Sequence, residues 1–128
     1  MKNKTGKIVI EQNANVWPHE LRMAKVLAQT GYNVKFIPAH NSICSADAYI
    51  NNTLFEFKSP EGSTIKCVEN NLQKAIRRQS KNVVIDSSRL RNIQDRSVQN
   101  YLIKRFQYKR GIKRIIFINK AGLVLDIF

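Results

Sequence analysis

An Asn-Asn pair at positions 51–52 separates two short stretches that both have the composition of β-strands. A two-residue turn of this kind joins antiparallel strands tightly and fixes their register, which pairs Ile50 with Thr53. Counting back along both strands then places Asp47 opposite Glu56. The segment is therefore predicted to be a β-hairpin with one possible alignment, and that alignment sets two carboxylates side by side.

The side chains of the second strand divide between two faces, because successive residues of a strand point in opposite directions. Glu56 and Lys58 share one face, and Phe55 and Phe57 share the other. Like charges directly opposite each other destabilise a sheet, with Cβ atoms about 4.5–5.5 Å apart. A divalent cation between Asp47 and Glu56 would offset the repulsion. The alternative is that both carboxylates are solvated on an uncovered face, with Lys58 as their diagonal ion-pair partner.

Glu20 is a candidate for a third acidic ligand. A helix is predicted at residues 18–30, between a proline and a glycine that are typical of helix ends, and at helical spacing Glu20 lies on the apolar face with Met23, Ala24 and Leu27. A buried carboxylate is costly unless it is paired or binds a metal. The alternative is an exposed glutamate in the first helical turn, where the helix dipole favours negative charge.

Composition limits the possible functions. The chain has 128 residues, 43% of them hydrophobic, which fits a single domain over residues 1–128. Its 22 Lys and Arg against nine Asp and Glu give a net charge of +13, which indicates a polyanionic partner, nucleic acid above all. A membrane surface is the weaker alternative, because the basic residues do not gather on one amphipathic helix. No signal peptide or membrane span is expected.

The periodicity of apolar residues predicts alternating strands and helices, and hence an α/β fold with a central mixed β-sheet and helices on both faces. Besides the helix at 18–30, a second is expected directly after residues 62–64 and a third at 94–109. Strands are expected at 7–11, 33–37, 46–50, 53–58, 82–86, 113–119 and 123–127.

Basic side chains on the second and third helices are candidates for contacts with phosphate groups, interleaved with aromatic residues that can meet unpaired bases. The alternative for each of them singly is a solvated helix face. His19 and His40 show no ligand spacing and are assigned no role, and Cys44 and Cys67 are interpreted as ordinary thiols. The candidate nucleic-acid-binding residues are Arg77, Arg78, Lys104, Arg105, Lys109 and Arg110.

The order of helix, three strands, helix and strand resembles the αβββαβ core of the PD-(D/E)XK nuclease superfamily, over about residues 17–86, with a helix and hairpin at 94–128 added. In that superfamily an Asp and the (D/E)XK Glu bind the metal, the Lys assists catalysis, and a helix Glu completes the acidic set. The resemblance carries these roles to Asp47, Glu56, Lys58 and Glu20, with Mg²⁺ as the expected ion and Mn²⁺ or Zn²⁺ as alternatives. Ala46 stands where the motif has proline.

The spacing of the three acidic residues, the helix carrying Gln73 and the strand at 82–86 are also similar to toxin modules at the C-terminal ends of contact-dependent growth-inhibition proteins. Some of these cleave tRNA and others cut DNA. The resemblance implies a ribonuclease toxin acting on tRNA in the cytoplasm of a target bacterium, as the C-terminal part of a larger exported protein with a cognate immunity protein. The alternatives are a DNA endonuclease with the same site, a non-catalytic nucleic-acid-binding module and a membrane-surface adaptor.

Overall fold

The computed structural model describes residues 5–38, 48–107 and 111–127. Within these ranges every expected helix and strand is present, and its ends lie within about two residues of the expected positions. The elements in chain order are β1 (Ile8–Ile10), α1 (Pro18–Gln29), β2 (Val34–Phe36), β3 (Ala48–Ile50), β4 (Thr53–Lys58), α2 (Ile65–Arg77), β5 (Asn82–Asp86), α3 (Asp95–Gln107), β6 (Arg114–Ile118) and β7 (Val124–Asp126).

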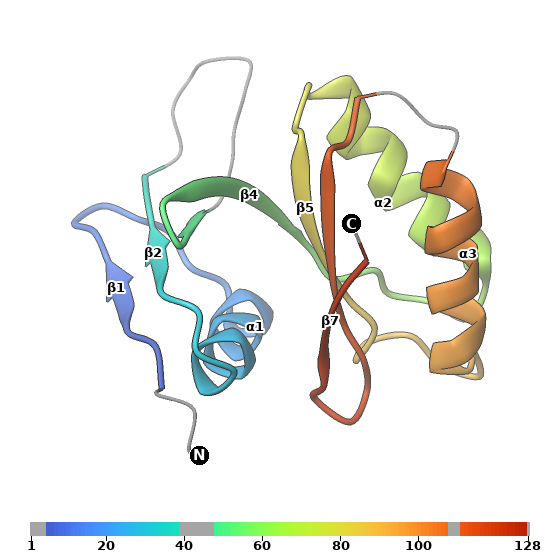
Figure 1. The fold of residues 1–128 in the computed structure, drawn as a ribbon, viewed down its shortest axis with the longest axis horizontal. Helices are drawn as coiled ribbons and strands as arrows, with labels where there is room; N and C mark the ends of the chain where they lie inside the picture. Colours follow the sequence, from blue (N-terminus) through green and yellow to red (C-terminus); the bar gives the residue numbers. More distant parts are fainter. Residues whose placement is uncertain (1–4, 39–47, 108–110, 128) are drawn as a thin grey trace.

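The strands form one seven-stranded sheet in the order β1-β2-β3-β4-β5-β6-β7 (Figure 1). The sheet is mixed, as expected: β1 and β2 are parallel, β2, β3 and β4 alternate in direction, β4, β5 and β6 are parallel, and β7 is antiparallel to β6. Each parallel pair is joined by a helix, because parallel strands need a long crossover connection. The stretch from α1 to β5 has the order helix, three strands, helix, strand.

Helices cover both faces of the sheet. Neighbouring residues of β5 and β6 belong to different apolar clusters: Val84 and Ile116 pack with Leu27 of α1, whereas Val83 and Ile115 pack with α2 and α3. Since successive strand side chains point to opposite faces, the two clusters lie on opposite sides of the sheet. Across the described residues, the helices are all too short or too polar to cross a membrane.

The hairpin between β3 and β4 has the expected register. Both turn residues are left-handed, with φ of 47° at Asn51 and 71° at Asn52, which is the backbone of a type I′ turn. The Asn51 side chain also accepts a hydrogen bond of 2.8 Å from the backbone N–H of Asn33, which fixes the turn against the start of β2. The expected pairing of Asp47 with Glu56 lies outside the described residues. The pairs that the structure describes are Ile50 with Thr53, Tyr49 with Leu54 and Ala48 with Phe55.

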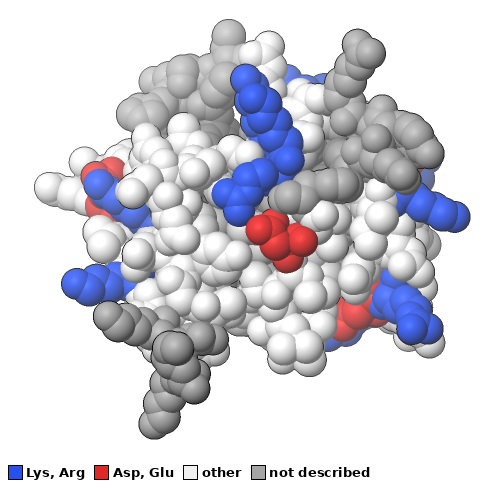
Figure 2. Space-filling view, viewed as in Figure 1, with Lys and Arg blue, Asp and Glu red and all other residues white. Residues whose placement is uncertain are grey.

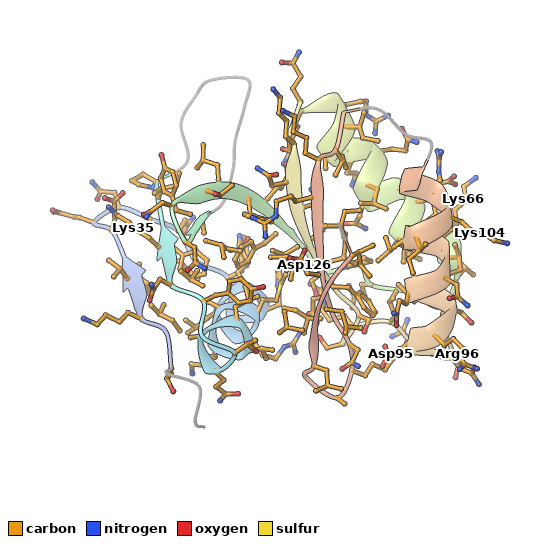
Figure 3. All side chains as sticks on the ribbon, viewed as in Figure 1. Lys35, Lys66, Asp95, Arg96, Lys104 and Asp126 are labelled. Atoms are coloured by element: carbon orange, nitrogen blue, oxygen red, sulfur yellow. The ribbon has the colours of Figure 1, made fainter. Side chains whose placement is uncertain are left out.

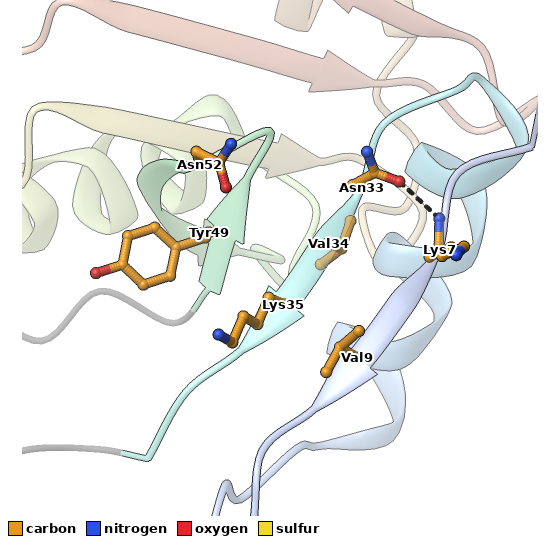
Figure 4. Close-up of a pocket in the computed structure, with 7 residues that line it drawn as sticks. All are labelled: Lys7, Val9, Asn33, Val34, Lys35, Tyr49 and Asn52. Carbon is orange, nitrogen blue, oxygen red and sulfur yellow. Dashed lines mark hydrogen bonds between the residues drawn. The ribbon is translucent and has the colours of Figure 1, made fainter.

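One face of the sheet is covered by α2 and α3 at β5 and β6, but no helix of the described residues covers it over β1, β2 and β3. A row of side chains there runs across β1, β2, β3 and β4, from Val9 through Lys35 and Tyr49 to Leu54. Val9 is 48% exposed and Leu54 is 42% exposed. We call these four residues the open face. Three of them, Val9, Lys35 and Tyr49, line a hollow of about 380 Å³ together with Lys7. Figure 4 shows these side chains and the strands that carry them.

Candidate active site

Glu56 is a buried carboxylate with three partners. Only 2% of the residue is exposed. Its Oε2 lies 2.7 Å from Nζ of Lys58 and 3.4 Å from Nη1 of Arg78. Its Oε1 accepts a hydrogen bond from the hydroxyl of Ser80. The alternative of a solvated Glu56 is therefore wrong, although Lys58 is the ion-pair partner that this alternative proposed. A buried charge needs such partners to offset its loss of hydration.

The end of α2 brings two of these partners to β4. Arg78 caps the helix, and Gln79 takes up a left-handed conformation with φ of 60°. The N–H of Gln79 then bonds to the carbonyl of Ile76 at 2.9 Å, and the N–H of Ser80 bonds to the carbonyl of Ala75 at 3.0 Å. This pair of bonds is the Schellman motif. It turns the chain back toward the sheet, so that Arg78 and Ser80 both reach the carboxylate of Glu56.

Glu20 points inward, as its helical position predicts, and is 9% exposed. The alternative of an exposed first-turn glutamate is wrong. Its Oε1 accepts a hydrogen bond of 2.9 Å from the backbone N–H of Trp17. Burial raises the pKa of the Glu20 carboxyl group above its ordinary value, while the Trp17 bond and the ammonium of Lys58 both act to lower it. Lys58 thus lies within electrostatic reach of two carboxylates, Glu20 and Glu56.

The donor chemistry fits a hard cation. Glu20 and Glu56 offer carboxylate oxygens, which Mg²⁺ prefers. Oε1 of Glu20 and Oε1 of Glu56 each accept one hydrogen bond, from Trp17 and Ser80, whereas Oε2 of Glu56 is already engaged by both Lys58 and Arg78. Over residues 5–38, 48–107 and 111–127, no three His, Cys, Asp or Glu side chains come together as a ligand set. Asp47, the expected third ligand, lies outside the described residues.

Sequence reasoning missed a third buried carboxylate, Asp86, at the end of β5. It is 2% exposed, and its Oδ2 accepts hydrogen bonds from Arg22 at 2.9 Å, Ser59 at 2.9 Å and the Ser88 hydroxyl at 2.7 Å. These donors come from α1, from the residue after β4 and from the loop after β5. The cluster therefore ties α1 to the carboxyl ends of two parallel strands. The signal in the sequence was an acidic residue that ends an apolar strand and precedes two serines.

The predicted nucleic-acid-binding residues lie in different places. Arg77 is exposed at the end of α2, and Arg78 lies beside Glu56. Arg105 lies 4.0 Å from the carboxylate of Glu69, and Figure 3 shows Lys104 on the outer side of α3, well away from β4. Lys109 and Arg110 are outside the described residues. On the face shown in Figure 2, Lys and Arg form several separate groups around the acidic side chain at its centre.

The fold and the site define an α/β domain with a buried Glu-Lys pair on a strongly basic chain. The family model of the contact-dependent growth inhibition CdiA C-terminal domain matches residues 45–124. Because the match covers more than half of the chain, the protein belongs to this family. None of the curated proteins matches the sequence.

A solved structure has the same overall fold. It is a chain of the CdiA-CT/CdiI toxin and immunity complex from Burkholderia pseudomallei, and the superposition has a TM-score of 0.73. The likeness covers 94% of this chain and 98% of that chain, and the two sequences are 18% identical. At this level of identity the comparison concerns the fold alone.

Proposed function

We propose that the protein is a toxin domain that hydrolyses phosphodiester bonds in RNA, with tRNA as the substrate, in a metal-dependent reaction. The observation that carries the proposal is the position of Lys58 within reach of two buried carboxylates, Glu56 at 2.7 Å and Glu20. An acidic pair with a lysine is costly to bury, yet such a set of groups is suited to metal-dependent phosphodiester hydrolysis, because carboxylates bind the ion and an ammonium stabilises negative charge. The membership in the CdiA C-terminal family and the PD-(D/E)XK-like order of elements support the same activity.

In this proposal Glu20, Asp47 and Glu56 hold Mg²⁺, with Mn²⁺ or Zn²⁺ as possible replacements. When bound, such an ion would supply positive charge next to the scissile phosphate and would make a water molecule more acidic. Lys58 forms an ion pair with Glu56 and places an ammonium where negative charge develops on the phosphate. Ser80 holds the other oxygen of Glu56, which fixes the orientation of the carboxylate.

The substrate class follows from charge and from the open face. The net charge of +13 favours a polyanion. Leu54 of the open face and Glu56 point to the same side of β4. A single strand of nucleic acid held at Glu56 would therefore continue across the open face, over Tyr49 and Lys35. Lys35 lies 3.4 Å from the carboxylate of Glu11, which a phosphate group would replace. Arg77 and Lys104 are exposed and available to the more distant parts of a folded RNA.

The same proposal extends to location and partner. We infer that the domain is the C-terminal part of a larger exported bacterial protein and acts in the cytoplasm of the target cell. The similar fold from Burkholderia pseudomallei comes from a toxin and immunity complex, which supports a cognate immunity protein for this chain. Such a partner is expected to be acidic where it meets this basic domain, with fast and salt-sensitive association.

The test is to incubate purified protein with tRNA, single-stranded DNA and duplex DNA, with Mg²⁺, Mn²⁺, Zn²⁺ or a chelator. We expect cleavage of tRNA with metal, none in chelator, and none by the Glu56→Gln variant. Glu61→Gln is the matched control, because Glu61 is 62% exposed and pairs with Arg89 on the surface. Cleavage of DNA alone would indicate the DNA endonuclease alternative. Binding without cleavage in any metal would indicate a non-catalytic module and refute the assigned roles.

A further inference from the structure

Trp17 is a large apolar side chain that the protein leaves in solvent. It is the single tryptophan of the chain, and 62% of it is exposed. Tryptophan is on average highly buried in folded proteins, because its ring removes a large apolar area from water. At position 17 most of this favourable burial of apolar area is lost.

Trp17 also does little for the helix that it precedes. It occupies the N-cap position of α1, with Pro18 as the first helical residue. Ser, Thr, Asp and Asn are preferred there, because a side-chain oxygen accepts a hydrogen bond from a backbone N–H of the first turn. The indole nitrogen is a donor only and cannot act in this way. Neither capping nor burial therefore accounts for tryptophan at position 17.

The backbone of Trp17 is anchored to the candidate active site. Its N–H donates a hydrogen bond of 2.9 Å to Oε1 of Glu20, the carboxylate that lies within electrostatic reach of Lys58. The fixed φ of Pro18 further restricts the chain at this point. The exposed indole is thus held beside Glu20, where a nucleic acid that reaches this carboxylate can contact it.

We propose that Trp17 stacks against an unpaired base of the bound nucleic acid next to the cleavage site. The choice of ligand rests on the proposed function and on the net charge of +13. Aromatic side chains in nucleic-acid sites bind unpaired bases through their π-faces, and losing one such stack weakens binding roughly 5- to 150-fold. Bases inside a duplex are already stacked on each other. Trp17 therefore favours a substrate with a single-stranded loop over a fully paired one.

The first experiment uses the intrinsic fluorescence of Trp17, which reports on this residue alone. A stem-loop RNA and a fully paired RNA duplex of equal length are titrated into Glu56→Gln protein and into native protein in chelator, and a labelled RNA gives the affinity by anisotropy. We expect the stem-loop to quench the fluorescence to saturation at the concentrations at which it binds, and the duplex to leave it nearly unchanged. Binding of the stem-loop without quenching would overturn the proposal.

The second experiment replaces Trp17 with serine and, separately, with phenylalanine. Trp17→Ser supplies a capping oxygen, so its Tm is expected to rise by a few degrees while its affinity for the stem-loop falls roughly 5- to 150-fold. Trp17→Phe is expected to keep most of the affinity. Leu123→Ser is the matched control, because Leu123 is also 62% exposed, and it is expected to bind normally. An unchanged affinity of Trp17→Ser would refute the stacking role.

The two proposals fail in different ways. If the native protein cleaves RNA and Trp17→Ser cleaves and binds equally well, the stacking role is wrong and the nuclease function stands. If stem-loop RNA quenches Trp17 and Trp17→Ser binds weakly, but no metal supports cleavage, the stacking role stands and the nuclease function is wrong. If the protein binds no nucleic acid, both are wrong.

Discussion

The ion pair between Lys58 and Glu56 predicts that substitutions at the two positions will not be additive. Lys58→Met removes the ammonium and keeps an unbranched side chain of similar length. Glu56→Gln removes the negative charge and keeps an oxygen for the Ser80 hydroxyl. Each single variant loses the 2.7 Å ion pair and leaves one charge of the pair behind. The double variant removes both charges, so neither remains unpaired.

The expected size of each effect follows from burial. Removing one partner of a buried ion pair costs about 3–5 kcal/mol, because the other charge remains in a poorly solvated site. Glu56 is 2% exposed, but Arg78 still lies 3.4 Å from the same oxygen, so we expect Lys58→Met to cost about 2–3 kcal/mol. Glu56→Gln should cost less, about 1–2 kcal/mol, because the flexible stem of Lys58 lets its ammonium move toward water. These losses leave most of a typical stability of about 5–15 kcal/mol.

The assay is urea unfolding of the four proteins at pH 7 and equal ionic strength. The double variant is expected to be more stable than the sum of the single effects predicts, by about 1–2 kcal/mol of coupling. For a chain of this length that corresponds to several degrees in Tm. Additive effects, with the double variant equal to the sum within about 0.5 kcal/mol, would show that the pair contributes nothing. In the cleavage assay all three variants are expected to be inactive.

Three further predictions concern Glu20, Asn51 and Asp86. Because burial raises the Glu20 pKa, the folded state holds a proton more tightly than the unfolded state. The stability of the native protein therefore falls as pH rises from the unfolded-state pKa to the folded-state pKa, and Glu20→Gln should remove this pH dependence. Between pH 4 and pH 7, the free energy of unfolding of the variant, measured in urea, should therefore rise relative to that of the native protein. A difference between the two proteins that stays constant with pH would contradict this. Asn51→Ala should lower the free energy of unfolding by about 1–2 kcal/mol, because alanine tolerates the positive φ poorly and the hydrogen bond from Asn33 is lost. Asn52→Gly should leave stability unchanged or raise it, because glycine adopts a positive φ freely. Equal losses of stability in the two variants would refute the turn assignment. Asp86→Ala should lower the free energy of unfolding by at least about 3 kcal/mol and Ser59→Ala by about 1 kcal/mol, both followed as a shift in Tm. The first removes the carboxylate that accepts hydrogen bonds from two hydroxyl groups and leaves Arg22 with the Ser88 hydroxyl in place of a charged partner. Equal effects would show that Asp86 is not the centre of the cluster.

The hairpin could be predicted from the sequence to the residue, because its determinants are local. Two asparagines tolerate the left-handed conformation that a type I′ turn needs, and the alternation of side chains then fixes the partners of Phe55 and Leu54. The inward direction of Glu20 was also predictable, because it depends only on the period of one helix. Such features need no knowledge of where distant segments meet.

The rest of the site depends on contacts between distant segments. Ser80 and Arg78 reach Glu56 across more than 20 residues of sequence, through a helix end that a glutamine closes in place of the usual glycine. The cluster around Asp86 joins it to Arg22, which is 64 residues away. Alternation also shows that the sheet has two faces, but not that α2 and α3 leave Lys35 and Tyr49 uncovered. The length and direction of the loops decide these points, and residue types do not reveal them.

The order of the strands in the sheet has a consequence for how the chain assembles. In the part of the chain that the structure describes, every strand lies next to the strand that precedes it in the sequence, and no strand is inserted between two others. Each new strand can therefore pair with the exposed edge of the strand before it as soon as it is free, without opening a pair that has already formed. A chain that becomes available from one end can therefore build this sheet one strand at a time, in the order of the sequence.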